Sequence, residues 1–308
     1  MSFHKINKNI SKVLIGQDHA IDLLMVGLIA NGHILLEDVP GTGKTTLAKS
    51  LAKSIDADFK RLQFTADTLP GDVTGLEYFD LKASDFKTRK GPIFSNIVLV
   101  DEINRAVPRT QSALLEVMEE RTVTISGETH KLPAPFLVLA TQNPLESAGT
   151  FPLPDAQLDR FLLTISQGYP SLQQEKEMIF RFKENNPIQE LLSVINCEEI
   201  LSYQEKAKKV TVHEDVLDYL LQIINFTRSH DQIEIGVSPR GTLAFTRAIQ
   251  ARALLNERDY CTPEDVRILA IPVCSHRISL TIEGEMKTTK RLIMKEIVES
   301  VFAPVEQI

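Results

Sequence analysis

The amino-acid sequence predicts an α/β fold in which a domain built on a parallel sheet precedes a smaller all-α domain. In the first half of the chain, short apolar runs alternate with helical patterns, which is typical of βαβ units and a parallel sheet. Some runs, such as Ile97–Val100 (IVLV), are apolar without alternation, as expected for strands covered on both faces. Beyond Gly168 the strand-like runs stop and helical patterns take over.

Five runs are predicted to form the strands of the sheet. In chain order they are His33–Glu37, Phe59–Phe64, Ile97–Val100, Phe136–Ala140 and Leu162–Ile165. Helices are predicted from apolar residues at helical spacing and from start signals such as a proline in the first turn. They are Thr45–Ile55 and Pro108–Glu120 in the first domain, then Val216–Arg228, Leu243–Asn256, a helix starting at Thr262 and Lys287–Val301 in the second.

The domain division follows from the length and from this change of pattern. A chain of 308 residues has room for two domains, and we place them at residues 1–168 and 169–308. Two insertions interrupt the first domain, near residues 71–94 and 122–132. The first holds β-type runs near Leu76–Phe79 and Asp85–Lys87, and the second alternates around Ser126-Gly127 as a β-hairpin does.

Composition narrows the function classes. The chain carries 34 Lys and Arg against 41 Asp and Glu, and this net charge of −7 argues against a dedicated nucleic-acid-binding protein, which usually presents a basic face. The three cysteines show neither disulfide nor metal-ligand spacing, which fits a reducing compartment. No signal-peptide core and no membrane-spanning apolar run is present. We therefore expect a soluble cytoplasmic protein.

A glycine-rich loop follows the first predicted strand and leads directly into a helix. The segment DVPGTGKT at residues 38–45 matches the phosphate-binding pattern G-x-x-x-x-G-K-[ST] at Gly43, Lys44 and Thr45, with Asp38 in place of the first glycine. In such a loop, backbone N–H groups bind phosphates, the lysine reaches the β- and γ-phosphates and the hydroxyl binds Mg²⁺. The residues predicted to bind the nucleotide are Val39, Pro40, Gly41, Thr42, Gly43, Lys44, Thr45 and Thr46.

Two acidic residues end the predicted strand Ile97–Val100. In open α/β folds, ligands bind at the carboxyl edge of the sheet, where these acids are expected to lie. Asp101 is predicted to hold Mg²⁺ together with Thr45, and Glu102 to polarise the attacking water as a general base. Alone, two acids after a strand are equally consistent with a helix cap. With the phosphate loop before them, they predict hydrolysis of ATP, with ATP and Mg²⁺ as cofactors.

Three further polar segments follow along the chain. Asn143 comes after the strand Phe136–Ala140, where an amide can orient water without adding charge. Arg160 lies in the segment LDRF, and Arg240 lies in SPRG at the start of a predicted helix. Each signal is weak alone, because an arginine near an aspartate is usually a solvated ion pair. Their order along the chain strengthens the functional interpretation of all three segments together.

Six segments in this order resemble the MoxR family of AAA+ ATPases. They are DVPGTGKT, LVDEINRA, PRTQSALLEVMEE, ATQNP, FPLPDAQLDRF and SPRG, and the resemblance runs from about Ile15 into the second domain. It implies an ATPase core with a helical lid, and a ring that is usually hexameric. It also implies the branch with an insertion in the second helix and a hairpin before the sensor strand, which matches the two insertions.

The resemblance also implies roles for individual residues. Asn143 corresponds to sensor 1, Arg160 to the arginine finger offered to a neighbouring subunit, and Arg240 to sensor 2, acting in its own site or in a neighbour's. Arg105 and Arg109 either face the adjacent subunit or lie on the surface. The expected partners are other copies of the chain, a client protein and a protein with a von Willebrand factor A domain.

Three function classes compete. The leading one, implied by the resemblance, is chaperone-like remodelling that matures or activates client proteins, with the hairpin at residues 122–132 contacting clients or transmitting the nucleotide state. The second is a nucleic-acid-dependent motor, which is disfavoured because that hairpin offers only His130 and Lys131 as cations and no aromatic residue. The third is a non-catalytic nucleotide-sensing scaffold, against which the intact Lys44, Asp101, Glu102 and Arg160 argue. A GTPase is disfavoured because no Asn-Lys-x-Asp segment exists to recognise guanine.

Overall fold

The structure is a computed structural model that describes residues 2–37, 41–142, 149–166, 168–184 and 187–304. Asp38, Val39, Pro40 and Asn143 therefore lie outside the described residues. The chain forms two compact units that interleave along the sequence. Unit 1 comprises Met1–Leu24, His33–Leu153 and Ile165–Leu201, and unit 2 comprises Met25–Gly32, Pro154–Thr164 and Ser202–Ile308. The division at residue 168 into an ATPase core and a lid stays a prediction.

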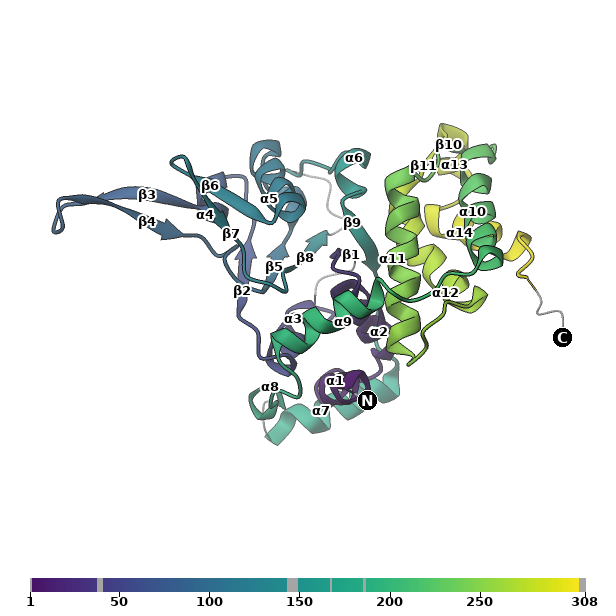
Figure 1. The fold of residues 1–308 in the computed structure, drawn as a ribbon, viewed down its shortest axis with the longest axis horizontal. Helices are drawn as coiled ribbons and strands as arrows, with labels where there is room; N and C mark the ends of the chain where they lie inside the picture. Colours follow the sequence, from purple (N-terminus) through teal and green to yellow (C-terminus); the bar gives the residue numbers. More distant parts are fainter. Residues whose placement is uncertain (1, 38–40, 143–148, 167, 185–186, 305–308) are drawn as a thin grey trace. The chain divides into compact units, whose positions relative to one another are not determined.

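A five-stranded sheet is the centre of the α/β architecture, with the strand order β2-β5-β8-β1-β9 (Figure 1). Its strands are β1 His33–Glu37, β2 Phe59–Gln63, β5 Ile97–Asp101, β8 Leu137–Gln142 and β9 Phe161–Ile165. The pairs β2–β5, β5–β8 and β8–β1 are parallel. Strand β5 is buried along its whole length, which explains its unbroken apolar sequence. The predicted strands and the predicted fold class are confirmed.

Helices surround the strands in unit 1 and make up most of unit 2. The helices that lie in unit 1, or begin there, are α1 Ser2–Ser11, α2 Asp18–Ile29, α3 Lys44–Ser54, α4 Pro70–Thr74, α5 Pro108–Glu120, α7 Leu172–Glu184, α8 Pro187–Glu190 and α9 Cys197–Ala207. Those of unit 2 are α6 Asp155–Leu158, α10 Glu214–Ser229, α11 Pro239–Leu255, α12 Pro263–Cys274, α13 Ile282–Lys287 and α14 Lys290–Ser300. Short strands β10 Ile233–Ile235 and β11 Ser279–Leu280 pair antiparallel in unit 2.

The start of α12 shows how local sequence fixes a helix in unit 2. Asp265 accepts hydrogen bonds from the backbone N–H and the hydroxyl of Thr262, which makes a capping box. The same buried carboxylate pairs with Arg252 and Arg258. The predicted start signal at Thr262 is therefore confirmed, and its acid also ties α12 to α11.

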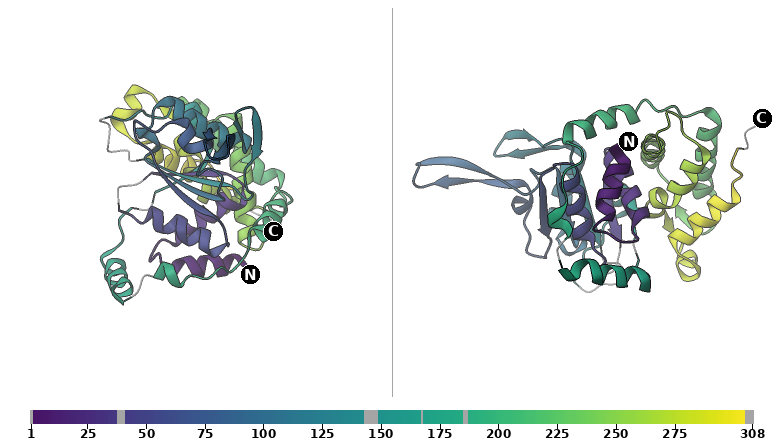
Figure 2. Two further views of the ribbon diagram at one scale, coloured as in Figure 1. Left: turned by 90° about the vertical axis from the view of Figure 1, so that its left-hand side faces the viewer. Right: turned by 90° about the horizontal axis from the view of Figure 1, so that it is seen from below.

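Both predicted insertions form antiparallel hairpins in unit 1. The first joins β3 Gly75–Asp80 to β4 Asp85–Lys90, and the second joins β6 Thr122–Ile125 to β7 Glu128–Lys131. The β3–β4 hairpin extends away from the other elements of unit 1 (Figures 1 and 2). At its base two glycines pass closely: a Cβ on Gly91 would lie 2.6 Å from the backbone nitrogen of Gly75 and 2.2 Å from the carbonyl oxygen of Val73. Only glycine fits at these two positions, which we call the glycine neck of the hairpin.

Two features of the described residues bear on function. None of their helices is both long and apolar enough to cross a membrane. Across the same part of the chain, no group of three His, Cys, Asp or Glu side chains is placed to hold a metal ion.

Candidate nucleotide site

The described residues of the glycine-rich loop, from Gly41 onwards, have the backbone conformation that phosphate binding requires. Gly41 and Gly43 have φ angles of 87° and 90°, a left-handed conformation that costs other residues energy. A Cβ on Gly41 would meet nothing within 4 Å, so the backbone angle and not crowding demands glycine there. Gly43 is the N-cap of α3, whose first residue is Lys44. The N-terminal end of α3, with its backbone N–H groups and the positive end of its dipole, fits an anionic phosphate.

Gln17 supports this loop from the segment between α1 and α2. Its side-chain amide donates a hydrogen bond from Nε2 to the carbonyl oxygen of Thr42 at 3.1 Å. Thr42 itself is buried, although it belongs to a loop. Sequence reasoning missed Gln17, because no local pattern links it to a loop residue 25 positions away.

Asp101 lies buried at the end of β5 and is fixed on both of its oxygens. The Thr141 hydroxyl donates to Oδ1 at 3.3 Å, and Arg61 Nε donates to Oδ2 at 2.5 Å. Thr141 reaches Asp101 because β5 and β8 are neighbouring parallel strands that pair Val100 with Ala140. These two contacts hold the carboxylate in one orientation.

Glu102 follows in a conformation that few residues adopt. Its φ and ψ are 57° and 53°, the left-handed region, so the chain turns sharply and directs Glu102 away from the strand path. Its N–H donates to Thr141 Oγ1 at 3.0 Å. Its carboxylate accepts a hydrogen bond from Gln63 Nε2 at 2.6 Å and pairs with Arg105 Nε at 3.1 Å.

Apart from Arg105, the partners of the two acids come from the two strands that flank β5. Gln63 ends β2, in register with Asp101 on β5, and Thr141 lies near the end of β8. Sequence reasoning missed Gln63, Arg61 and Thr141, because only the strand order brings them to the acids. It left Arg105 open between a subunit interface and the surface, and the structure pairs this arginine with Glu102.

In unit 2, a buried ion pair organises the segments that carry Arg160 and Arg240. Arg277 Nε donates to Asp159 Oδ1 at 2.7 Å, and the Ser238 hydroxyl donates to Asp159 Oδ2 at 2.8 Å. Ser238 also accepts a hydrogen bond from the N–H of Gly241, which makes it the N-cap of α11. Asp159 precedes Arg160 and Ser238 lies two residues before Arg240, so one carboxylate fixes the backbone beside both arginines.

Arg277 is almost completely enclosed in this network. Its side chain is 1% exposed, and its guanidinium also donates to the carbonyl oxygens of Phe161, Leu162 and Val273. Burial lowers the pKa of Arg277, while Asp159 opposes that shift. Such a charge is tolerated in the interior only because all its donors are satisfied.

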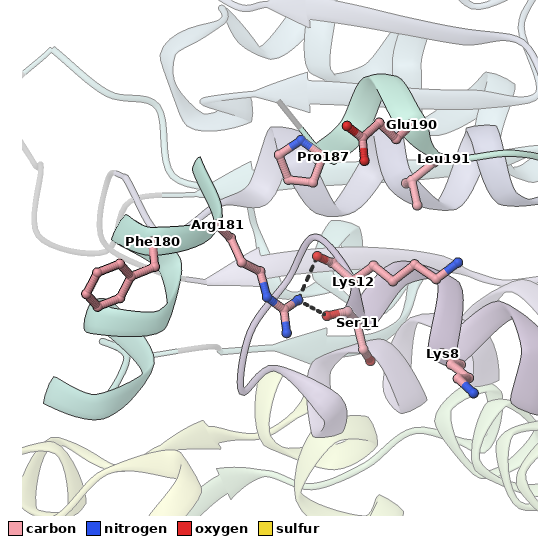
Figure 3. Close-up of a pocket in the computed structure, with 8 residues that line it drawn as sticks. All are labelled: Lys8, Ser11, Lys12, Phe180, Arg181, Pro187, Glu190 and Leu191. Carbon is pink, nitrogen blue, oxygen red and sulfur yellow. Dashed lines mark hydrogen bonds between the residues drawn. The ribbon is translucent and has the colours of Figure 1, made fainter. Parts of the chain in front are cut away.

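A cavity of about 670 Å³ also lies in unit 1, between α1, α7 and α8 (Figure 3). It is lined by Lys8, Ser11, Lys12, Phe180, Arg181, Pro187, Glu190 and Leu191. Arg181 donates to the carbonyl oxygens of Ser11 and Lys12, so its charge already caps the C-terminal end of α1. None of the predicted site residues lines this cavity, so we do not assign it to the nucleotide.

Two family models match the chain. Residues 33–163 match the ATPase family associated with various cellular activities (AAA), and residues 225–297 match the AAA lid domain. The five-stranded sheet, the glycine loop before α3 and the acids at the end of β5 agree with the first match. The protein is therefore an ATPase of the AAA class with a helical lid.

Relatives along nearly the whole chain narrow the class. The chain is 46% identical to YeaC of Bacillus subtilis, over 98% of this chain and 95% of that protein. It is 38% identical to the chaperone MoxR1 of Mycobacterium tuberculosis, over 96% of this chain and 80% of that protein. A crystal structure of a Cytophaga hutchinsonii protein matches with a TM-score of 0.91 and 37% identity, over 99% of this chain and 95% of that one. The chain belongs to the MoxR family.

Proposed function

We propose that the protein hydrolyses Mg·ATP to remodel, mature or activate partner proteins, in the manner of a chaperone. The observation that carries the proposal is the pair of acids at the end of β5, because their environments differ. Asp101 is buried and held by Thr141 and Arg61, which suits a metal ligand. Glu102 turns away from the strand and is more exposed than Asp101. Its carboxylate accepts a hydrogen bond from Gln63 and pairs with Arg105, which leaves it near solvent, as suits a base that acts on water.

The roles of the remaining residues complete this proposal. Backbone N–H groups of the loop, from Val39 to Thr46, would bind the phosphates, and Lys44 would neutralise their charge. Thr45 and Asp101 would hold Mg²⁺, which supplies charge neutralisation at the β- and γ-phosphates. Asn143 would orient the attacking water.

Other parts of the proposal concern assembly. We place Arg160 at the edge of a ring, hexameric in the resembling family, where its guanidinium would stabilise the γ-phosphate of a neighbouring subunit. Arg240 would act as sensor 2, in its own site or in a neighbour's. A client protein and a partner with a von Willebrand factor A domain complete the assembly, in the cytoplasm. The relative named chaperone MoxR1 supports the chaperone-like role.

The Glu102→Gln variant tests the chemistry. We expect it to bind Mg·ATP with near-normal affinity and to hydrolyse ATP at least about 100-fold more slowly, since a positioned base contributes that much. Glu116→Gln, an exposed position on α5, is the matched control and should turn over ATP at the normal rate. Lys44→Ala should instead weaken ATP binding itself.

Several outcomes would contradict the proposal. Normal hydrolysis by Glu102→Gln would remove Glu102 from the role of base. Strong stimulation of ATP turnover by single-stranded DNA would favour the nucleic-acid motor over the remodeller. Unchanged ATP affinity in Lys44→Ala would refute the assignment of the lysine.

A further inference from the structure

The β3–β4 hairpin exposes several large apolar side chains to solvent. Its apolar residues are between 43% and 84% exposed, and they are Leu76, Tyr78, Phe79, Leu81 and Phe86. We call these five, together with Lys82 and Arg89, the hairpin surface. A two-stranded ribbon buries little of its own side chains, so water contacts most of this apolar area. Exposed apolar patches of this kind mark sites of interaction.

The strand register places apolar side chains on both faces of the ribbon. Leu76 and Tyr78 lie opposite Arg89 and Lys87, so one face carries an apolar column beside a basic column. Phe79 lies opposite Phe86 with a ring-centroid distance of 5.2 Å, so an aromatic pair occupies the other face. Because both faces carry apolar side chains, packing one face against unit 1 would still leave the apolar side chains of the other face in water.

The second hairpin differs in this respect. Its apolar residues Val123 and Ile125 are buried, and among the described residues 122–132 no large apolar side chain is exposed. We expect this second hairpin to contact clients or to transmit the nucleotide state. The distribution of exposed apolar side chains favours the first hairpin for that contact instead, because binding energy comes mainly from apolar area removed from water.

Charge indicates the chemistry of the occupant. Residues 75–90 carry four cations and three anions, a net charge of +1 in a chain whose net charge is −7. Lys87 pairs with Asp80, and Lys90 Nζ lies 5.1 Å from the Phe94 ring centroid. Lys82 and Arg89 form no ion pair with any residue that the structure describes. A segment that supplies both apolar side chains and carboxylates would complement this surface.

The backbone indicates the shape of the occupant. The sheet that contains β4 has two strands, so the outer edge of β4 pairs with no strand among the described residues. An extended segment can add to such an edge through main-chain hydrogen bonds, while its side chains alternate between the two faces. Both faces here offer apolar contacts to such a segment.

We propose that the hairpin surface binds an extended, acidic and apolar segment of the protein that this ATPase remodels. The inference rests on the proposed remodelling function and names the partner chemistry that it uses. The contact lies outside the residues assigned to ATP, so binding of the segment and hydrolysis can be measured separately.

The absence of tryptophan from the chain makes a direct test possible. Phe86→Trp places a single indole on the hairpin surface. We expect its emission to shift to the blue, saturably, on titration with a synthetic peptide in which Glu alternates with Leu and Val. The same peptide with Lys in place of Glu should bind at least about tenfold more weakly, a difference of about 1.4 kcal/mol. Equal binding of the two peptides, or no shift with either, would overturn the proposal.

Charge reversal locates the contact. In the Phe86→Trp background, Lys82→Glu with Arg89→Glu should weaken binding of the acidic peptide at least about tenfold. Lys131→Glu, on the second hairpin, is the matched control and should leave it unchanged. If Lys131→Glu weakened binding while the double variant did not, the second hairpin would be the contact and the proposal would fail.

ATP turnover of the same samples separates this inference from the proposed function. All hairpin variants should hydrolyse ATP at the wild-type rate. Normal turnover without peptide binding would overturn the inference and leave the ATPase assignments intact, whereas peptide binding without turnover would do the reverse. A blue shift on concentrating the protein alone would make the surface an interface between copies, and would also overturn the inference.

Discussion

At the scale of single residues, Thr141 determines how the two acids are arranged. Its hydroxyl accepts the Glu102 N–H and donates to Asp101. Thr141→Val keeps the shape but removes both hydrogen bonds, leaving a partly buried N–H unsatisfied. We expect a loss of about 1–3 kcal/mol in the free energy of unfolding, measured in urea, together with slower ATP turnover. Thr141→Ser retains the hydroxyl and should behave like the wild type.

His33 gives the protein a sensitivity to acid. It is buried on β1, where Nδ1 accepts the Val138 N–H and Nε2 donates to the carbonyl oxygen of Met118, each at 2.9 Å. Burial, helped by the charge of Arg121, lowers the pKa of His33 from 6.5 to about 3. The neutral imidazole, with its proton on Nε2, is therefore the form that the fold requires.

The sign of the pH dependence follows from this shift. Above pH 6.5 the imidazole is neutral in both the folded and the unfolded chain. Between pH 6.5 and about pH 3, only the unfolded chain binds the proton, so His33 lowers the free energy of unfolding by about 1.4 kcal/mol for each unit by which the pH falls. His33→Gln should reduce the slope of stability against pH by about one proton between neutral pH and about pH 4, measured by urea unfolding. An unchanged slope would contradict the buried neutral imidazole.

The site divides into residues that the sequence could predict and residues that it could not. Lys44, Thr45, Asp101 and Glu102 follow from motifs that occupy a few consecutive positions, so spacing alone indicated them. Gln63 and Thr141 hold the acids only because β2 and β8 flank β5. Strand order depends on long-range pairing, and no local pattern in a single sequence specifies it.

At the scale of elements, prediction succeeded where a strong local signal exists. The bounds of α5 are those predicted, because Pro108 begins the helix and apolar residues repeat along it. Short elements such as α4, β10 and β11 were missed, since two to five residues cannot show a period. Helix α7 was missed for a different reason: apart from Leu172, its apolar residues lie together within residues 178–182 and do not repeat along its length.

The Asp159 network makes a prediction about unit 2. Asp159→Asn removes the charge that compensates Arg277, whose side chain is 1% exposed. Breaking a buried pair in this way costs about 3–5 kcal/mol, which we expect to see in urea unfolding. Asp155→Asn is the control: among the described residues, this exposed carboxylate accepts a side-chain hydrogen bond from the Ser279 hydroxyl alone, and its loss should cost less than about 1 kcal/mol. Equal effects of the two variants would contradict the structural importance of Asp159.

At the scale of the whole molecule, the proposed ring predicts cooperation between subunits. If Arg160 acts on a neighbour, specific ATPase activity should rise with protein concentration as rings form. Arg160→Ala should bind ATP without hydrolysing it, a loss of about 10³–10⁵ in rate by comparison with related arginine fingers. Mixing it with Lys44→Ala should restore part of the activity, because an intact pocket can then sit beside an intact arginine. No rescue in mixtures shown to co-assemble would contradict action between subunits.

The position of the first insertion along the chain has a mechanical consequence. The hairpin leaves the sheet after β2, which ends at Gln63, and returns to it at β5, which ends at Asp101, and the two strands are paired in register. A force on the hairpin would therefore act, through Gly75 and Gly91 in the glycine neck at its base, on β2 and β5, and Gln63 at the end of β2 holds Glu102. If binding of a client segment to the hairpin changes the Gln63–Glu102 hydrogen bond and thereby the affinity for the nucleotide, thermodynamic linkage requires the bound nucleotide to change the affinity for the client by the same factor. The first insertion would then both bind the client and respond to the nucleotide that is bound.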